Sequence, residues 1–545
     1  MQDSLTLAQS LRATGRWRRA LYLAGFAATL LAAYATRAPM LTDWDSWEYA
    51  AQAVHCRVSG LCLGRWWFAL LMHLSCQVGL WVGLPLSHNF QALRVTVALC
   101  TAGAVVGAMH WTYLLSRRLL ASVLAGVMLI VSGSLMAYAS AVMNEGPTLL
   151  FLVLALLGWE AALRRSGARG CDPQSADARS PRAAAAMAIL AGAVFGIAAN
   201  MREPALMLCF WPVVSCFVDR PVHRWRLLAL AAIATVLTFG FGAAMTWFQR
   251  GEPLLELLAG YSKYMAQERA TYGWDKSGNV AFLAIHLHAA VPLATTMFVV
   301  FLVYLPMALA RKCKHLRQVP GRRLAALFAS TIPYLLMTWY NPDLHFNYRL
   351  MLPMGLIFAP IAAICVAAML SDVVDGARRR AAGFVGAAAM TLATVGAIAV
   401  SLVTCNELLS RHLNYSRWQA VIFQGIEQLD DGTCVLGGPG APMVEYLREL
   451  KFRPRMEKMI PGFEATPDLM TERFDQRLAK GKRVFVYCKP NNWASPGRSK
   501  EYDATQAAVK RFPRRSGPPV RWGGGTVRPF VELLPRTDSS KAANE

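Results

Sequence analysis

Uninterrupted apolar segments dominate the 545-residue chain, and several of them reach about 20 residues. A helical segment of this length crosses the roughly 30 Å hydrocarbon core of a bilayer, because each helical residue advances about 1.5 Å. Only 16% of the residues are charged, whereas an average soluble domain has about a quarter. The sequence therefore predicts a polytopic α-helical membrane protein, and it excludes both a disordered chain and a single compact soluble domain.

The positive charges predict how the chain crosses the membrane, because loops rich in Lys and Arg remain on the cytoplasmic side. Arg16, Arg18 and Arg19 stand directly before the first apolar segment, which has no convincing cleavage site, so the N-terminus is expected in the cytoplasm. About eleven spans are expected, at approximately Ala20–Thr36, Ala92–Ser116, Leu119–Ala141, Pro147–Leu163, Ala183–Asn200, Ala205–Val218, Leu227–Phe248, Leu287–Ala310, Leu324–Tyr340, Leu350–Leu370 and Ala382–Thr404.

A further apolar stretch, Trp66–Leu86, is interpreted as an interfacial helix on the outer surface. Counting it as a span would place the basic loops at Arg117–Arg118 and at residues 164–182 outside. Its content of tryptophan is also typical of the headgroup boundary. Residues 44–86 are therefore expected to form interfacial helices in the first outer loop.

Residues 405–545 differ in composition from residues 1–404, since they are charged, rich in Pro and Gly, and without a further span. Short apolar strands are predicted at Thr433–Leu436 and Arg483–Cys488, and a helix at Met443–Leu450. We expect a small C-terminal α/β domain on the outer, periplasmic side.

The 12 cysteines show no zinc-ligand spacing, so the sequence predicts no metal site. Two pairs, Cys56 with Cys62 and Cys434 with Cys488, lie in the predicted outer regions, where a disulfide can persist. For both pairs, a disulfide and two free thiols remain open alternatives.

Charged residues from five predicted outer loops meet the membrane at one surface, and this convergence is the main indication of a functional site. A charge at the bilayer centre costs roughly 2.5–3.5 kcal/mol, so such clustering is informative. Carboxylates together with cations suit a reaction in which an acceptor hydroxyl loses a proton while an anionic phosphate departs. Singly, each residue also has a structural interpretation: Asp43 or Asp45 as a helix cap, Glu145 as a first-turn acid, and Arg349 as a snorkelling side chain.

The first outer loop resembles that of the GT-C membrane glycosyltransferases, which include the protein O-mannosyltransferases and the lipid A aminoarabinose transferases. Asp45-Ser46-Trp47-Glu48-Tyr49-Ala50 is similar to the acidic first-loop motif of this superfamily. The resemblance continues, more weakly, through Asn89–Arg94, Arg117–Arg118, Glu145, Asn200–Pro204 and Tyr348–Pro353. Two departures are Glu145, where many members have Asp, and Gly64-Arg65-Trp66-Trp67, which replaces a Pro-rich signature.

The resemblance implies a GT-C fold and an inverting transfer of a sugar from a polyprenyl-phosphate donor. The Ala- and Arg-rich composition suggests a bacterium, which makes undecaprenyl phosphate the default donor lipid. The acceptor would be a glycan, a lipid or a protein at the outer face of a bacterial cytoplasmic membrane. Asp45 would be the base, with Asp43 as the less favoured neighbour, and Glu145 would position the acceptor or the sugar. The substrate-binding residues would be Arg202, Arg349, Tyr348, His345, Tyr49, Lys263 and Arg269.

No cofactor is expected beyond the donor, and a divalent metal ion is not expected to be essential. The net charge of +23 is accounted for by cytoplasmic loops and a basic outer domain, so nucleic acid is not an expected partner. Two alternatives stay open: a transporter or flippase of a lipid-linked sugar, and a non-catalytic membrane scaffold with an outer binding domain. Nearly all charges lie at the ends of the spans, which favours the enzyme over a transporter.

Overall fold

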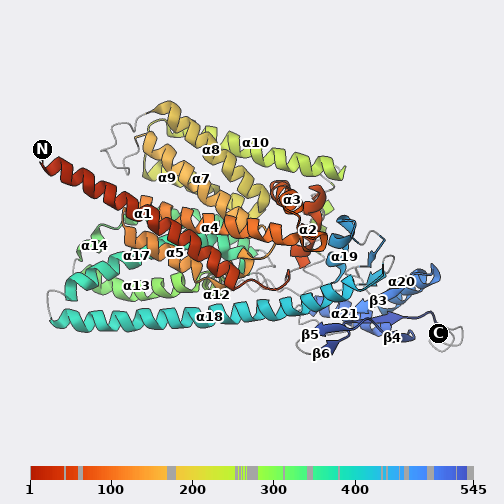
Figure 1. The fold of residues 1–545 in the computed structure, drawn as a ribbon. Helices are drawn as coiled ribbons and strands as arrows, with labels where there is room; N and C mark the ends of the chain where they lie inside the picture. Colours follow the sequence, from red (N-terminus) through yellow and green to blue (C-terminus); the bar gives the residue numbers. More distant parts are fainter. Residues whose placement is uncertain are drawn as a thin grey trace.

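A computed structural model of the chain shows a bundle of long helices with a small α/β domain at one end (Figure 1). The structure describes residues 2–41, 44–58, 65–167, 180–251, 280–310, 313–340, 348–377, 381–430, 434–436, 440–452, 455–459, 466–487, 496–522 and 525–536, with single residues between 256 and 266. The start of the first helix lies at the end of the bundle remote from the α/β domain (Figure 1).

The bundle is formed by helices that run along its length and by shorter helices between them. Its elements are α1 (Gln2–Ala35), α4 (Phe90–Ser116), α5 (Leu119–Ile130), α6 (Gly133–Ala139), α7 (Glu145–Arg165), α8 (Pro181–Met201), α9 (Phe210–Val218), α10 (Arg224–Arg250), α12 (Val280–Ala290), α13 (Pro292–Ala310), α14 (Lys314–Arg317), α15 (Gly321–Ser330), α16 (Ile332–Tyr340), α17 (Leu352–Ala377) and α18 (Ala381–Glu427), with 3-10 helices η1 (Leu86–His88), η3 (Glu203–Cys209) and η5 (Tyr348–Met351). Helices α2 (Trp44–His55) and α3 (Trp66–Trp81) lie at the end that carries the α/β domain (Figure 1).

Seven helical segments in the described part of the chain are long and apolar enough to cross a membrane. They are Leu86–Ser116, Glu145–Arg165, Pro181–Met201, Arg224–Arg250, Pro292–Ala310, Arg349–Asp375 and Leu392–Ser410. Helices α5 and α6 make an eighth if they are one broken span, bent by 68°. The polytopic helical architecture is thus confirmed, but the expected count of eleven is not.

Helix breaks account for much of this difference. The segment expected at Leu119–Ala141 breaks before α6, where Ser132 Oγ accepts a hydrogen bond from the backbone N–H of Leu135. The segment expected at Leu324–Tyr340 divides at Thr331, two residues before Pro333, which has no N–H to continue the helical bonding. Helix α3 has 16 residues and is not among the seven segments, and its interfacial placement stays a prediction.

Helices α8 and α10 pack closely because two glycines four residues apart, Gly192 and Gly196, face α10. A Cβ on Gly192 would overlap the carbonyl of Ala231, and one on Gly196 would overlap the side chain of Thr238. Thr235 Oγ1 donates to the carbonyl of Gly192 at 2.9 Å, across the two helices. Small residues at this spacing are a common way for membrane helices to approach each other.

The C-terminal domain contains a five-stranded sheet in the order β2-β1-β3-β7-β4. Its strands are β1 (Cys434–Leu436), β2 (Glu457–Met459), β3 (Val484–Tyr487), β4 (Arg514–Ser516) and β7 (Phe530–Leu533), beside a hairpin of β5 (Val520–Trp522) and β6 (Gly525–Val527). Strand β1 is parallel to β2 and β3, whereas β7 is antiparallel to β3 and β4. The domain helices are α19 (Gly440–Glu449), α20 (Pro467–Ala479) and α21 (Pro496–Val509). The small α/β unit therefore exists, and β1, β3 and α19 overlap the strands and helix predicted there.

A buried carboxylate lies on β7, the strand next to the edge strand β4. Glu532 on β7 is only 4% exposed, and Arg483 donates to it through Nε at 2.8 Å while Arg515 forms a second ion pair. Burial raises the pKa of Glu532, but the hydrogen bonds and charges of the two arginines outweigh burial and hold it at about 2. Glu532 therefore carries its negative charge at neutral pH.

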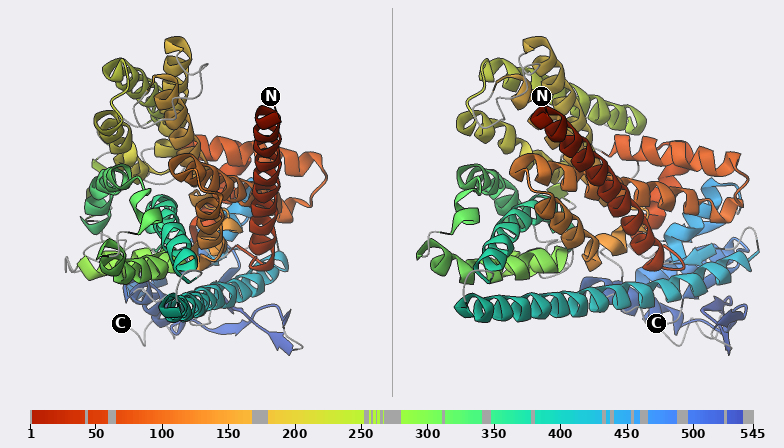
Figure 2. Two further views of the ribbon diagram at one scale, coloured as in Figure 1. Left: turned by 90° about the vertical axis from the view of Figure 1, so that its left-hand side faces the viewer. Right: turned by 60° about the vertical axis from the view of Figure 1, so that its left-hand side comes forward.

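The C-terminal domain and the first outer loop share one hydrophobic core. Trp47 of α2 is fully buried and stacks on Phe423 of α18 with ring centroids 5.5 Å apart, while Phe90 and Tyr446 contact it at 5.3 and 5.6 Å. Ser416 Oγ, also on α18, accepts a hydrogen bond from the backbone N–H of Met40 at 2.9 Å. Because α18 runs unbroken from residue 381 to 427, the domain boundary expected at residue 404 falls inside a continuous helix. Both views in Figure 2 show α18 along one side of the bundle.

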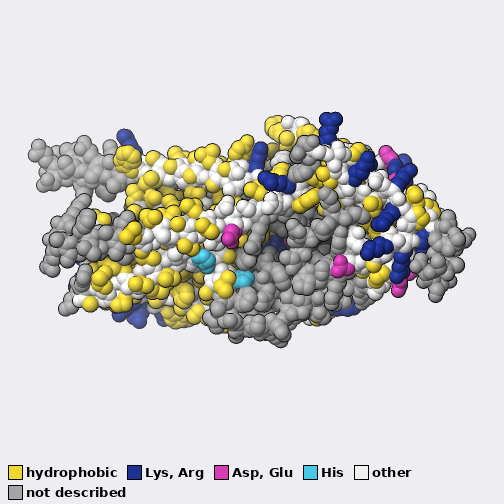
Figure 3. Space-filling model, turned by 90° about the horizontal axis from the view of Figure 1, so that it is seen from below, with side chains coloured by type: hydrophobic (Ala, Val, Ile, Leu, Met, Phe, Trp, Pro, Cys, Tyr) yellow, Lys and Arg dark blue, Asp and Glu magenta, His cyan; other side chains and the backbone are white. Residues whose placement is uncertain are grey.

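Apolar side chains cover the outside of the bundle and charged ones gather beyond it. Figure 3 shows a face on which hydrophobic side chains cover the length of the bundle, and Lys and Arg gather over the C-terminal domain. Exposed apolar residues on α10 and α13 include Leu237 at 66% and Val303 at 77%, whereas the apolar part of α17 is fully enclosed. This pattern is that of a lipid-facing surface around a protein-packed centre.

Candidate active site

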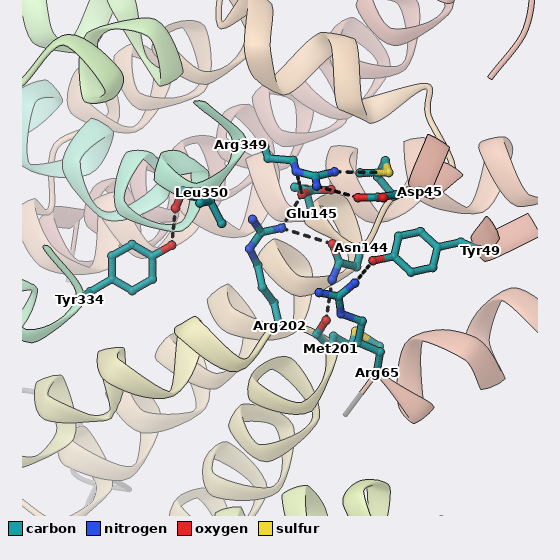
Figure 4. Close-up of polar contacts among 11 residues, drawn as sticks. Asp45, Tyr49, Arg65, Asn144, Glu145, Met201, Arg202, Tyr334, Arg349 and Leu350 are labelled. Carbon is teal, nitrogen blue, oxygen red and sulfur yellow. Dashed lines mark hydrogen bonds and ion pairs between the residues drawn. The ribbon is translucent and has the colours of Figure 1, made fainter. Parts of the chain in front are cut away.

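A buried ion pair lies at the centre of the predicted site (Figure 4). Arg202 Nη1 donates to Glu145 Oε1 and, at 3.2 Å, to Asn144 Oδ1. The side chain of Glu145 is 1% exposed and that of Arg202 is 6% exposed. Among the described residues, Glu145 Oε2 and Arg202 Nε have no hydrogen-bond partner, although both atoms are buried. The pair therefore keeps hydrogen-bonding capacity that the described protein groups do not use.

Arg349 joins this pair to a second, more accessible carboxylate. Its Nη2 donates to Asp45 Oδ2 at 2.7 Å, and its Nε lies 3.6 Å from Glu145 Oε1. The side chain of Asp45 is 36% exposed, compared with 1% for Glu145. Two carboxylates and two guanidiniums thus form a chain in which Asp45 is the more accessible carboxylate.

Helix ends supply these four residues. Asp45 lies in the first turn of α2 and Glu145 begins α7, positions where the helix dipole favours a carboxylate. Arg202 follows the last residue of α8 in an extended conformation, and Arg349 lies in η5 just before α17. These four side chains come from separate parts of the chain and converge in Figure 4.

The structure adds residues that the sequence analysis did not assign to the site. Asn144 Nδ2 donates to the carbonyl of Met201 at 2.6 Å and so ties the start of α7 to the end of α8. Arg65 donates to the hydroxyl of Tyr49, and its own N–H donates to the carbonyl of Asn200 at 2.6 Å. Arg65 adopts φ 75°, a left-handed conformation that no sequence motif predicts.

Several predicted site residues are not placed at this cluster. Asp43, Arg269 and His345 lie outside the described residues, as does the side chain of Tyr348. Lys263 is exposed, and no contact joins it to the cluster within the described ranges. Cys62 and Cys488 also lie outside those ranges, so both disulfides stay predictions. In the part of the chain that the structure describes, no three His, Cys, Asp or Glu side chains group as metal ligands.

Helix α7 carries a second buried ion-pair cluster at its other end. Glu160 lies 15 residues after Glu145, roughly 22 Å along the helix axis. Arg323 of α15 donates to Glu160 Oε2 at 2.6 Å and lies 3.1 Å from Asp219 Oδ2, and Arg164 donates to Glu160 Oε1 at 3.0 Å. This cluster joins α7, α9 and α15 at a distance from Asp45.

Part of the chain matches a known protein family. Residues 83–248 match the family described as dolichyl-phosphate-mannose-protein mannosyltransferase. The matched segment contains Glu145 and Arg202 but neither Asp45 nor Arg349. No curated protein matches the chain.

Solved structures define the fold class. The chain is similar to ArnT from Cupriavidus metallidurans bound to undecaprenyl phosphate, with a TM-score of 0.57 and 14% identity over 94% of this chain and 97% of that one. It is also similar to the oligosaccharyltransferase of Archaeoglobus fulgidus tethered with an acceptor peptide, with a TM-score of 0.53 and 13% identity over 93% of this chain and 74% of that one. Both are GT-C glycosyltransferases, so the GT-C fold expected from the first outer loop is confirmed.

Proposed function

We propose that this protein is an inverting glycosyltransferase that moves a sugar from a polyprenyl-phosphate donor to a hydroxyl group of an acceptor. The observation that carries the proposal is the pairing of the accessible Asp45 with Arg349, beside the buried pair of Glu145 and Arg202. A membrane glycosyltransferase that uses a lipid-linked donor needs these two elements, a reachable base and fixed positive charge. The GT-C fold and the mannosyltransferase family match support the same reaction class.

In the proposed reaction, Asp45 accepts the proton of the acceptor hydroxyl while that oxygen bonds to the anomeric carbon of the sugar. The bond between this carbon and the phosphate oxygen breaks, and polyprenyl phosphate leaves with the electron pair. Arg202 and Arg349 stabilise the charge that develops on the phosphate. A base of this kind contributes roughly 10²–10⁴-fold in rate. Attack from the face opposite to the phosphate inverts the anomeric centre.

Glu145 has a different role in this proposal from that of Asp45. It is 1% exposed, and it contacts both arginines. A carboxylate in this position orients the two guanidiniums, so that Glu145 positions the donor phosphate through them. Because two guanidiniums supply the positive charge, we expect transfer to persist after dialysis against EDTA.

The proposed location is the bacterial cytoplasmic membrane, with the N-terminus in the cytoplasm and the C-terminal domain on the outer face. The basic loops support this orientation, and so does the placement of the start of α1 at the end remote from the C-terminal domain (Figure 1). An antibody to a C-terminal epitope tag should bind intact spheroplasts. Binding only after permeabilisation would reverse the orientation.

The function is tested with a panel of undecaprenyl-phosphate sugars. Thermal stabilisation of the purified protein identifies the donor, and release of undecaprenyl phosphate in the presence of glycan, lipid or peptide acceptors then measures transfer. Asp45→Asn should abolish transfer and keep donor binding, whereas Glu48→Gln, the matched change one turn along α2, should keep both. Full transfer by Asp45→Asn would refute the assignment of the base. Donor movement across vesicles without transfer would support the transporter instead.

A further inference from the structure

A polar groove on the C-terminal domain lies outside the proposed active site. It has a volume of about 640 Å³ and lies between the last turns of α18 and the hairpin of β5 and β6. Its lining residues are Gln424, Glu427, Gln428, Pro519, Arg521, Thr526 and Arg528. This volume is in the range of small-molecule sites, but those are mostly apolar, whereas every lining residue here except Pro519 is polar. These side chains can form hydrogen bonds with a polar ligand.

The groove is also positively charged. Residues 504–531, which include the hairpin, contain six Lys and Arg residues and no Asp or Glu. Within the described residues, neither Arg521 nor Arg528 forms an ion pair with a carboxylate, although Arg515 nearby is paired with Glu532. Arg528 Nη1 donates to the carbonyl of Gly517 at 2.9 Å, which fixes its guanidinium in place. Figure 3 shows Lys and Arg gathered at this end of the molecule.

The chemistry of the lining selects one class of ligand. Guanidinium groups bind carboxylates and phosphates in a bidentate manner, which is the reason to expect an anionic group on the ligand. The amides of Gln424 and Gln428 and the hydroxyl of Thr526 can pair with sugar hydroxyls. We propose that this groove binds a saccharide that carries a carboxylate or phosphate group, as part of the acceptor.

The position of the groove supports a role in acceptor binding, an inference that rests on the proposed function. Gln424 directly follows Phe423, which stacks on Trp47, and Trp47 lies two residues after Asp45 on α2. The groove and the proposed base are therefore carried by elements that share one core. In this proposal, a long acceptor is held at the groove and presents one of its hydroxyls to Asp45.

The proposal is tested by direct binding to the full-length protein without donor. The probes are tri-galacturonate, its neutral methyl ester, a bis-phosphorylated glucosamine disaccharide and inorganic phosphate, measured by calorimetry at low and high salt. We expect at least one charged saccharide to bind at least tenfold more tightly than the neutral ester and than inorganic phosphate, because a hydrogen bond between a guanidinium and an anionic group is stronger than one to a neutral group. The double change Arg521→Gln, Arg528→Gln should weaken this binding at least tenfold.

The control is Lys510→Gln, Arg514→Gln, which removes two charges from the same basic segment outside the groove and should change the affinity less than twofold. If both double variants lose the same affinity, the proposal is overturned, because the ligand is then attracted by the overall positive charge of the segment and not by the groove. Failure of the wild type to bind either charged saccharide would also overturn it, and so would equal binding of the neutral ester or of inorganic phosphate. Asp45→Asn should bind the probes normally. If Asp45→Asn loses transfer but the wild type binds no probe, the proposed function stands and only the assignment of the groove as an acceptor site is rejected.

Discussion

Trp47 connects the C-terminal domain to the helix that carries Asp45, and its removal tests whether this connection positions the base. Helix α2 has only 12 residues, a length at which an isolated helix is marginal in water. Its orientation therefore depends on tertiary contacts, and among the described side chains of α2 the largest fully buried one is Trp47, which contacts Phe90, Phe423 and Tyr446. Trp47→Ala removes this anchor two residues from Asp45.

The structure sets the size of the expected effect. Trp47 is fully buried, so truncation to alanine should lower the free energy of unfolding by about 3–5 kcal/mol. A shift of about 1 Å in a catalytic group costs on the order of 10²-fold in rate. We therefore expect kcat to fall about 100-fold in Trp47→Ala. The affinity for undecaprenyl phosphate should change less than threefold, because Arg202 and Arg349, which hold the phosphate in the proposal, lie outside α2.

The assay compares kcat, donor affinity and thermal stability with those of two further variants. Trp159→Ala is the matched control, because Trp159 is equally buried but donates to Ser215 Oγ at 2.8 Å, away from α2. It should lose similar stability and keep kcat within about threefold. Trp47→Phe should restore most of kcat, since a phenyl ring keeps part of the stack. An unchanged kcat in Trp47→Ala, or equal losses in both alanine variants, would refute the positioning role.

Three further predictions address other contacts. Arg202→Gln should lower the free energy of unfolding by about 3–5 kcal/mol, because Glu145 stays buried without its main partner, and it should abolish donor binding. Arg323→Gln, the control, should cost similar stability and keep donor binding. Thermal unfolding with and without undecaprenyl phosphate measures both effects. Gly192→Leu should lower the melting temperature, because its side chain meets the backbone of α10. Glu532, with a pKa of about 2 in the fold, should contribute about 3 kcal/mol to the free energy of unfolding above pH 5, and this contribution should be lost as the pH falls towards 2. In Glu532→Gln, the free energy of unfolding measured from pH 2 to 7 should depend less on pH.

The sequence predicted which residues come together at the site better than it predicted the helices that carry them. Sorting the charges by loop places Asp45, Glu145, Arg202 and Arg349 at one surface, the resemblance to the GT-C glycosyltransferases singles them out, and the structure links all four. Sorting works because buried charge is costly in a membrane, so charges from separate loops gather where they can pair. The catalytic and binding roles of these residues stay predictions until the variants are measured.

Other features could not be read from the sequence because they depend on tertiary geometry. Arg323 meets Glu160 across 163 residues, and no local pattern identifies that partner. The helix breaks before Gly133 and at Thr331 follow from capping and from a missing backbone N–H inside runs that hydropathy alone reads as continuous. A composition change at residue 404 suggests a domain boundary, but α18 continues because residues 405–424 contain neither Pro nor Gly to interrupt the helix.

The unbroken α18 connects the membrane-spanning helices rigidly to the C-terminal domain. Its 47 residues span roughly 70 Å, of which about 26 Å follow the apolar segment that ends at Ser410. A change in bilayer thickness that tilts this helix by about 10° would swing its end by ~4–5 Å if that end were free. The contact of Phe423 with Trp47 restrains this end of the helix. A thinner or thicker membrane therefore strains the contact between Phe423 and Trp47, which lies on the same helix as Asp45. The transfer rate should therefore depend on lipid chain length in reconstituted vesicles.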